Sequence, residues 1–163
     1  MTTRRELLGW TGLGIAGFAI GGCGGAKAAP AERFAYTLTD AQWRRKLDGP
    51  AYRVLRHEDT ETPGTSPLLG EHRAGIFHCK GCAQPVFNSR TKFESGTGWP
   101  SFYAPLPGGV ATRSDRSLLM ERVEVHCSRC GGHLGHVFDD GPRPTGKRYC
   151  MNGVAMTFAP ART

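Results

Sequence analysis

The chain has 163 residues and a formal net charge of +7, with 21 lysines and arginines against 14 aspartates and glutamates. That length predicts one domain of ordinary size once an N-terminal leader is set apart. Beyond the leader the basic residues form a single run of three, Arg44–Lys46, and no stripe interleaved with aromatic residues. This scattered distribution argues against a nucleic-acid partner, and the positive charge itself favours acidic partners only weakly. With 23 glycines and 11 prolines, many turns and few long helices are expected.

The N-terminal segment, residues 1–28, has the pattern of an export signal. Arg4 and Arg5 precede an uncharged apolar stretch from Leu7 to Ile20, which is too short to span a membrane as a helix. The paired arginines resemble a twin-arginine signal, which routes chains already folded in the cytoplasm. A general signal with two arginines by chance is the alternative. We therefore expect an exported protein of the periplasm or cell envelope.

Two sites compete for removal of this leader. Residues 26–28 form an Ala-x-Ala cleavage site, whereas residues 20–23 resemble the box at which bacterial lipoproteins are cut and acylated on cysteine. The second site is favoured because Cys23 has no other evident role, and acylation would make Cys23 a membrane anchor. A linker over residues 29–37 then leads to a globular domain over residues 38–163.

This domain is predicted to begin with two short helices and to continue in short strands. Thr39–Gln42 has the pattern of a capping box that opens a helix through Leu47, with a stop at Gly49–Pro50. Ala51–Arg56 predicts another helical turn, and residues 60–70 a loop rich in proline and glycine. Short antiparallel strands are then expected in the runs separated by glycine, proline and aspartate, at residues 75–78, 85–87, 117–120, 123–125, 148–151 and 154–158.

Four of the six cysteines form two Cys-x-x-Cys pairs, Cys79/Cys82 and Cys127/Cys130. Four thiolates satisfy tetrahedral zinc and leave no open position, so the pairs predict one structural zinc ion per chain. Nearby glycines, Gly81 and Gly131–Gly132, are expected to let the backbone turn around the metal. Two disulfides are the alternative for an exported chain, although a bridge within Cys-x-x-Cys gains little from loop closure. Iron in the same geometry stays open.

Because these pairs and Cys23 account for five cysteines, Cys150 remains free for chemistry. In an extended segment, Arg148, Cys150 and Asn152 would point to the same face. A guanidinium beside a thiol favours the thiolate, which is the nucleophilic form. The alternative is a buried, inert cysteine that packs as a small hydrophobic side chain.

Two further segments can serve a reactive thiol. Residues 95–102 form a glycine-containing, flexible loop that carries Trp99. Residues 132–138 hold His133 and His136 beside the second cysteine pair. Singly, the tryptophan could be a core anchor and the histidines ordinary polar residues at a turn. Together with Cys150 they supply a nucleophile, proton donors near neutral pH and an apolar wall. This combination predicts a thiol-based redox enzyme.

These segments resemble the B-type methionine sulfoxide reductases. The resemblance spans residues 38 to 160, in the same order, and does not cover the leader. It rests on long motifs, at residues 79–82, 92–102, 127–142 and 144–152. It implies a mainly β domain with an antiparallel two-sheet or barrel-like (β-tent) core, short N-terminal helices and a structural zinc ion on the four paired cysteines. It also implies reduction of the R epimer of methionine sulfoxide in oxidised proteins, and of the free amino acid.

The resemblance also implies roles for individual residues. Cys150 is the nucleophile, and the sulfoxide oxygen is held and protonated by His133, His136 and Asn152. The substrate methyl group is received by Trp99, with Phe138 and Arg148 as further substrate-binding residues. The physical chemistry agrees, because a thiolate attacks a sulfoxide only if an acid protonates the leaving oxygen, and an indole face suits a methyl group.

One position departs from the family pattern. Many relatives have a second cysteine where this chain has Thr97, and that cysteine condenses with the sulfenic acid formed on the nucleophile. We therefore expect an external reductant, either a thioredoxin-like protein or a small thiol, to recycle Cys150. The rival interpretation of the chain is a non-enzymatic zinc-binding interaction module, in which Trp99, His136 and Cys150 would have no purpose.

Overall fold

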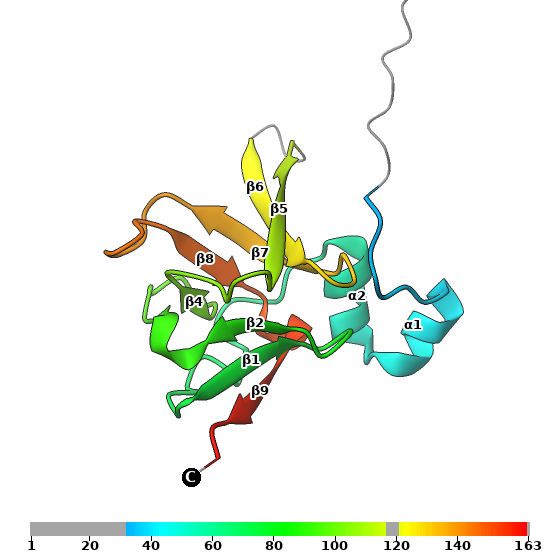
Figure 1. Ribbon diagram of the computed structural model, residues 1–163, viewed down its shortest axis with the longest axis horizontal. Helices are drawn as coiled ribbons and strands as arrows, with labels where there is room; N and C mark the ends of the chain where they lie inside the picture. The colour runs from blue at the N-terminus through cyan, green and yellow to red at the C-terminus, as the bar shows by residue number, and fades with distance from the viewer. Residues whose placement is uncertain (1–31, 117–120, 163) are drawn as a thin grey trace, which may run out of the picture. The chain divides into compact units, whose positions relative to one another are not determined.

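The computed structural model describes residues 32–116 and 121–162, and all of these except Glu32 belong to one compact unit, Arg33–Thr163. Two short helices come first and antiparallel strands follow (Figure 1). Within the described ranges, no helix has the length and apolar character needed to cross a membrane. The leader and its two cleavage sites lie outside the described residues.

Both helices begin at a capping side chain. Helix α1 spans Asp40–Lys46, and its predicted capping box is confirmed: the Thr39 hydroxyl accepts from the Gln42 N–H, and the Gln42 side chain accepts from the Thr39 N–H at 2.8 Å. Helix α2 spans Gly49–His57 and is capped by Asp48. The expected stop at Gly49–Pro50 is thus the start of α2, because proline fits a first helical turn, whose N–H groups have no helical partner.

The strands form two antiparallel sheets. The three-stranded sheet has the order β2-β1-β9, and the six-stranded sheet has the order β3-β4-β8-β7-β6-β5. The strands are β1 (Gly75–Cys79), β2 (Pro85–Asn88), β3 (Lys92–Phe93), β4 (Ser101–Phe102), β5 (Val110–Asp115), β6 (Arg122–Cys127), β7 (His133–Phe138), β8 (Arg148–Met151) and β9 (Met156–Pro160). The expected mainly β, two-sheet class with short N-terminal helices is confirmed.

Most of the expected strands are present, but the structure adds others. The runs at residues 75–78, 85–87, 123–125 and 148–151 fall in β1, β2, β6 and β8. The run at 154–158 is divided between a 3-10 turn, Gly153–Ala155, and β9. The run at 117–120 lies outside the described residues. Strands β3, β4, β5 and β7 were not expected, and β4 occupies the end of the segment expected to be a loop. In β5 and β7, serine, glycine and histidine obscure the apolar alternation that marks a half-buried strand.

An aromatic cluster joins the two sheets. The ring of Phe102 on β4 stacks on Phe87 of β2 at 4.3 Å between centroids and meets Phe77 of β1 edge-on at 4.9 Å. All three side chains are fully buried. Each buried ring of this size contributes roughly 2–3 kcal/mol of transfer free energy. Because β4 pairs with β8, this core also fixes the strand that carries Cys150.

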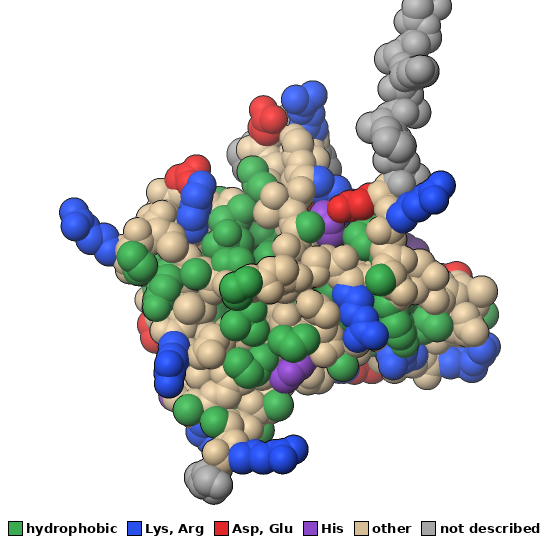
Figure 2. Space-filling model, viewed as in Figure 1, with side chains coloured by type: hydrophobic (Ala, Val, Ile, Leu, Met, Phe, Trp, Pro, Cys, Tyr) green, Lys and Arg blue, Asp and Glu red, His purple; other side chains and the backbone are tan. Residues whose placement is uncertain are grey.

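Lysine and arginine side chains are scattered over the face drawn in Figure 2, separated by apolar and uncharged groups. Several are held in ion pairs with neighbouring carboxylates, such as Arg44 with Asp40 and Lys80 with Asp48. On this face the basic side chains therefore stand apart from one another and form no continuous stripe.

Candidate active site and metal centre

The two Cys-x-x-Cys pairs meet in one buried cluster. Cys79 ends β1 and Cys127 ends β6, while Cys82 and Cys130 lie in the turns that follow. Their four sulfur atoms lie within 4.8 Å of one another. The Cys79 and Cys130 sulfurs are 3.7 Å apart and those of Cys82 and Cys127 are 3.5 Å apart. The cluster therefore joins the end of a strand in each sheet.

The two turns repeat the same backbone hydrogen bonds. In the first, the Cys79 N–H donates to Gln84 and the Ala83 N–H donates to Cys79. In the second, the Cys127 N–H donates to Gly132 and the Gly131 N–H donates to Cys127. The residue directly after each pair has a positive φ, 60° at Ala83 and 67° at Gly131. Gly81 was expected to let the first loop turn, but the left-handed conformation in that loop is adopted by Ala83 instead.

The arrangement suits a metal ion with four sulfur ligands. Four ligands about 2.3 Å from a central zinc-sized ion lie roughly 3.8 Å apart in a tetrahedron, and the observed sulfur distances are close to that spacing. All four cysteines are free thiols in the structure, so it does not support the alternative of two disulfides. The cluster can hold a metal ion in a closed site, which leaves catalysis to another part of the fold.

Cys150 lies at the centre of the six-stranded sheet. Strand β8 pairs with β4 on one side, where Ser101 is opposite Cys150, and with β7 on the other side, where His136 is opposite Cys150. Close approach of β7 depends on Gly135, because a Cβ there would lie 2.1 Å from the Cys150 carbonyl oxygen. The half-buried thiol opens into a cavity of about 130 Å³, lined by Thr60, Trp99, Arg122, Gly135, His136, Phe138, Cys150 and Asn152.

Glu61, on the loop after α2, fixes two of the lining residues. The Trp99 indole N–H donates to the Glu61 carbonyl at 2.9 Å. The Asn152 side chain accepts from the Glu61 N–H at 2.8 Å and donates to the Leu134 carbonyl at 3.1 Å. The Glu61 carboxylate in turn accepts from the Gly153 N–H at 2.6 Å. Sequence reasoning missed Glu61, since it lies in a loop without a recognisable motif.

His136 is held by a carboxylate. Its Nε2 lies 2.9 Å from the Asp115 carboxylate, which also accepts from Arg122 at 2.6 Å. Because an ionised carboxylate only accepts, His136 Nε2 carries the hydrogen. Burial lowers the pKa of His136, and the hydrogen bond to Asp115 opposes part of that effect. The ring is therefore biased toward its neutral form.

His133 does not line the cavity beside Cys150. It is 2% exposed, and its Nδ1 lies 2.7 Å from the Glu124 carboxylate, whose other oxygen accepts from Arg113. It lines a neighbouring polar cavity of about 310 Å³, which it shares with His136. The two imidazole rings are 5.3 Å apart at an angle of 64°. His133 thus packs on His136 without lining the cavity beside Cys150.

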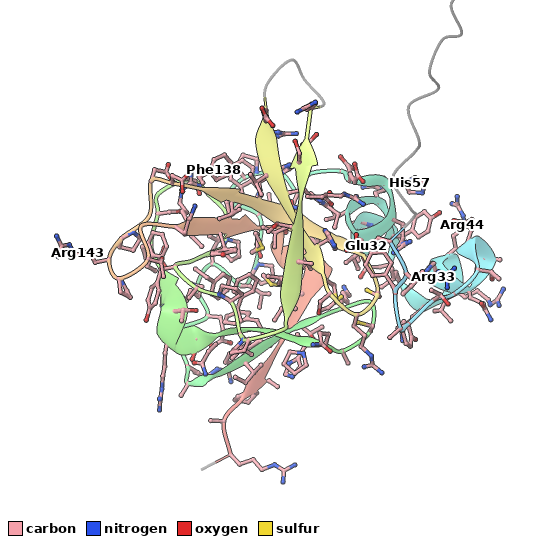
Figure 3. All side chains as sticks on the ribbon, turned by 45° about the horizontal axis from the view of Figure 1, so that its top comes forward. Glu32, Arg33, Arg44, His57, Phe138 and Arg143 are labelled. Carbon is pink, nitrogen blue, oxygen red and sulfur yellow. The ribbon has the colours of Figure 1, made fainter. Side chains whose placement is uncertain are left out.

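Phe138 and Arg148 pack on each other at the rim of the site. Phe138 lies at the end of β7 (Figure 3), and its side chain lines the cavity. The Arg148 guanidinium lies 4.4 Å from its ring centroid and binds Asp140 through two hydrogen bonds of 2.8 and 2.9 Å. Asp140 is the main cause that raises the pKa of Arg148, and Cys150 adds a smaller contribution. Arg148 itself does not line the cavity.

A hydroxyl group also lies beside the thiol. Thr97 Oγ1 lies 3.8 Å from Cys150 Sγ, and Thr97 is the position at which the sequence resemblance implies a second cysteine in many relatives. In the described part of the chain, every cysteine other than Cys150 belongs to the buried four-sulfur cluster. Fold and site together define the class of a thiol-dependent oxidoreductase that carries a buried four-cysteine cluster.

Comparison with known proteins agrees with this class. The family model described as the SelR domain matches residues 47–160. The chain is 49% identical over 125 residues to "Peptide methionine sulfoxide reductase MsrB" of Methylibium petroleiphilum, covering 76% of this chain and 91% of that protein. The protein of the same name from Agrobacterium fabrum is 48% identical over 123 residues, covering 75% of this chain and 91% of that protein.

A third relative of the same name, from Methanosarcina barkeri, is 50% identical over 121 residues, which is 74% of this chain and 85% of that protein. The chain belongs to the SelR-domain family, that of the B-type methionine sulfoxide reductases. The resemblance recognised in the sequence is confirmed, and the rival interpretation as a non-enzymatic module is not favoured.

Proposed function

We propose that this chain reduces the R epimer of methionine sulfoxide, in proteins and as the free amino acid, with Cys150 as the nucleophile. The observation that supports this most strongly is the meeting of Cys150, Trp99, His136 and Asn152 around one cavity. These residues come from two strands, a loop and the turn after β8, so they meet only in the folded chain. Family membership supports the same activity.

The reaction transfers oxygen to the thiol. The Cys150 thiolate attacks the sulfoxide sulfur, the oxygen is protonated, and the result is methionine and a sulfenic acid on Cys150. The substrate sulfur gains two electrons and Cys150 loses two. Two external thiols then restore Cys150, with release of water and formation of their disulfide. The physiological source of these thiols is proposed to be a thioredoxin-like protein or a small thiol.

Side chains around the cavity divide this work. His136 is proposed to donate a proton to the sulfoxide oxygen, and its position opposite Cys150 in the wall of the cavity supports this role. Asn152, held by Glu61 and Leu134, positions the oxygen. His133 packs on His136 and contacts Glu124, and it is proposed to supply protons to His136.

The substrate methyl group is proposed to contact apolar rings. Trp99 lines the cavity with its indole orientation fixed by the Glu61 carbonyl, and Phe138 adds a second ring at the rim. An aromatic face accommodates a methyl group and disfavours a charged one. Arg148 is proposed to act on substrate binding through Phe138, since its guanidinium covers that ring.

Zinc is proposed as the metal of the four-cysteine cluster. Four thiolates at tetrahedral spacing form a closed site, which is the geometry of structural zinc. The site links β1 of one sheet to β6 of the other, so the metal is expected to contribute folding energy. Iron has the same geometric fit, and metal analysis distinguishes the two.

Export is proposed from the leader alone. Residues 1–28 are the proposed signal, residues 29–37 a linker and residues 38–163 the reductase domain, which contains the family match at 47–160. The protein is proposed to repair oxidised proteins in the periplasm or cell envelope, with lipid anchoring through Cys23. Replacement of Arg4 and Arg5 by lysine should block export, because paired arginines are what that pathway recognises.

The direct test of the activity uses the two epimers separately. The purified protein, with dithiothreitol as reductant, should convert the R epimer of methionine sulfoxide to methionine and leave the S epimer unchanged. Preferential consumption of the S epimer would contradict the family's chemistry. No conversion of either epimer by a folded, metal-loaded protein would support the non-enzymatic interpretation.

A further inference from the structure

Three hydroxyl groups form a continuous chain that ends at the reactive thiol. Thr97 Oγ1 lies 3.8 Å from Cys150 Sγ and 2.8 Å from Ser95 Oγ. Ser95 Oγ lies 2.7 Å from Ser101 Oγ, and the Ser101 hydroxyl donates to the Trp99 carbonyl at 3.2 Å. The far end is fully desolvated, because Ser101 is 1% exposed. The chain links Cys150 to the backbone of the tryptophan that lines the same cavity.

We propose that Thr97 is a catalytic residue whose hydroxyl donates a hydrogen bond to the Cys150 thiolate, and that Ser95 and Ser101 position and polarise that hydroxyl. The proposal rests on the proposed role of Cys150 as the nucleophile. Thr97 therefore has a different role from that of a resolving thiol. Its hydroxyl stabilises the ionised sulfur before the reaction and takes no part in a disulfide afterwards.

Counting hydrogens shows that the chain has two ordered arrangements. Each hydroxyl has one hydrogen to donate, and the Trp99 carbonyl can only accept. When Ser101 donates to Trp99, Ser95 must donate to Ser101 and Thr97 to Ser95. Thr97 then has no hydrogen left for sulfur, and it can only accept from the Cys150 S–H. This arrangement matches the neutral thiol.

The second arrangement reverses every donor. Thr97 donates to the sulfur, Ser95 donates to Thr97, and Ser101 turns from the Trp99 carbonyl to Ser95, which is the nearer acceptor at 2.7 Å against 3.2 Å. This arrangement matches the thiolate, which has no hydrogen and accepts a charge-assisted bond. The backbone N–H of Thr97 also points at Ser95 Oγ, at 3.4 Å, so Ser95 is kept in place in both arrangements.

Other groups near Cys150 approach from different directions. His136 on β7 and Arg122 on β6 line the cavity, with Asp115 bound to both of them. Arg148 lies two residues away on β8 and is paired with Asp140. From β4, on the remaining side, the residue opposite Cys150 is Ser101, the last member of the hydroxyl chain. The three hydroxyl groups thus supply hydrogen-bond donors to Cys150 from the side of β4, a strand that contains no charged residue.

The test measures thiolate reactivity and turnover separately. Thr97→Val removes the hydroxyl and keeps the branched shape, Thr97→Ser keeps the hydroxyl, and Ser95→Ala and Ser101→Ala interrupt the chain further away. Thr91→Val is the matched control, because its half-buried hydroxyl binds the Asn88 and Ala104 carbonyls instead. For each variant, the rate of Cys150 alkylation by iodoacetamide is followed across pH, together with methionine formed in a single turnover without reductant.

Thr97→Val should slow alkylation at neutral pH and the single turnover by about ten-fold or more, the factor for one lost hydrogen bond to a charged atom. Its alkylation profile should move to higher pH. Ser95→Ala and Ser101→Ala should lose about two-fold or more, since hydrogen bonds in a chain polarise one another. Thr97→Ser should restore both rates, and Thr91→Val should match the unaltered chain.

Alkylation of Thr97→Val with the profile of Thr91→Val would overturn the proposal. A slow Thr97→Val beside unaffected Ser95→Ala and Ser101→Ala would overturn the part played by the two serines. If Thr97→Val does not fold, as judged by circular dichroism and thermal unfolding, Thr97→Ala takes its place in both assays. Alkylation that depends on Thr97 in a protein unable to reduce methionine sulfoxide would instead contradict the proposed function.

Discussion

The Asp115 carboxylate and the His136 imidazole are joined by a hydrogen bond of 2.9 Å, although they lie on β5 and β7 with β6 between them. Arg122 on β6 donates to the same carboxylate oxygen at 2.6 Å. The contact holds the ring that faces Cys150 and opposes the lowering of its pKa by burial. An acidic residue from an unexpected strand therefore controls the proposed proton donor.

Asp115→Asn should shift the pH dependence of the reductive step. If protonated His136 is the acid, the rate declines as pH rises through the pKa of His136. Removing the carboxylate charge removes a contribution that raises this pKa, while Arg122 remains to lower it. The declining limb should therefore move to lower pH. Single-turnover methionine formation across pH measures the shift.

Asp139→Asn is the matched control for that experiment, because it makes the same change of charge at an exposed carboxylate that is paired with Lys147. Its pH profile should coincide with that of the unaltered chain. A profile of Asp115→Asn that also coincides would show that the protonation of His136 does not limit the step.

Loss of any cluster cysteine should unfold the domain. We expect about one metal ion per chain, and replacing Cys79, Cys82, Cys127 or Cys130 by serine should abolish cooperative unfolding, because metal binding and folding are linked. Elemental analysis identifies the metal, and thermal melts with and without a chelator measure its contribution. A well-folded, metal-free preparation that contains two disulfides by mass would contradict this prediction.

Cys150→Ser should eliminate turnover and leave the fold intact. The side chain is half-buried, and its contacts with Thr97 and the cavity do not hold the sheets together. A serine hydroxyl is far less nucleophilic toward sulfur at neutral pH than a thiolate. Activity toward the R epimer and a thermal melt are the two measurements. An undiminished rate in this variant would exclude Cys150 as the nucleophile.

Trp99→Ala should weaken substrate binding more than it slows chemistry. It removes the apolar surface proposed for the methyl group, and KM should rise by about four-fold or more, the equivalent of one buried methyl group. Trp99→Phe keeps an aromatic face but loses the hydrogen bond to the Glu61 carbonyl. Its KM should therefore lie between that of the unaltered protein and that of Trp99→Ala. If kcat falls in both variants at constant KM, the indole acts in the chemical step instead.

Recycling should stop at a sulfenic acid when reductant is withheld. One equivalent of substrate should yield about one methionine per chain and a trappable sulfenic acid on Cys150. Thr97→Cys places a thiol beside that sulfur and should convert the product to an internal disulfide, seen by mass as the loss of one water. The control is a protein that lacks residues 1–28 and keeps Thr97. An intramolecular disulfide to Cys150 in that protein would refute direct recycling by an external thiol.

Local chemistry in the sequence determined several parts of the molecule. The capping box at Thr39, the paired cysteines and the run from Arg148 to Met151 each depend on neighbours within a few residues, and each is present as expected. Long motifs also allowed the family to be recognised. Such features are encoded locally, because a cap, a metal-binding turn and a short strand are built from consecutive residues.

Only the tertiary structure decided how these parts meet. Strand pairing across the order β4-β8-β7 places Cys150 between Ser101 and His136, and the same sheet brings Asp115 to His136. Pairing between distant segments is set by the burial of the whole core, such as the stacking of Phe87 on Phe102, and leaves no periodic signal in either segment. For this reason Cys150 and His136 could be proposed from the sequence, whereas Asp115, which holds His136, and Glu61, which holds Trp99 and Asn152, emerged only from the fold.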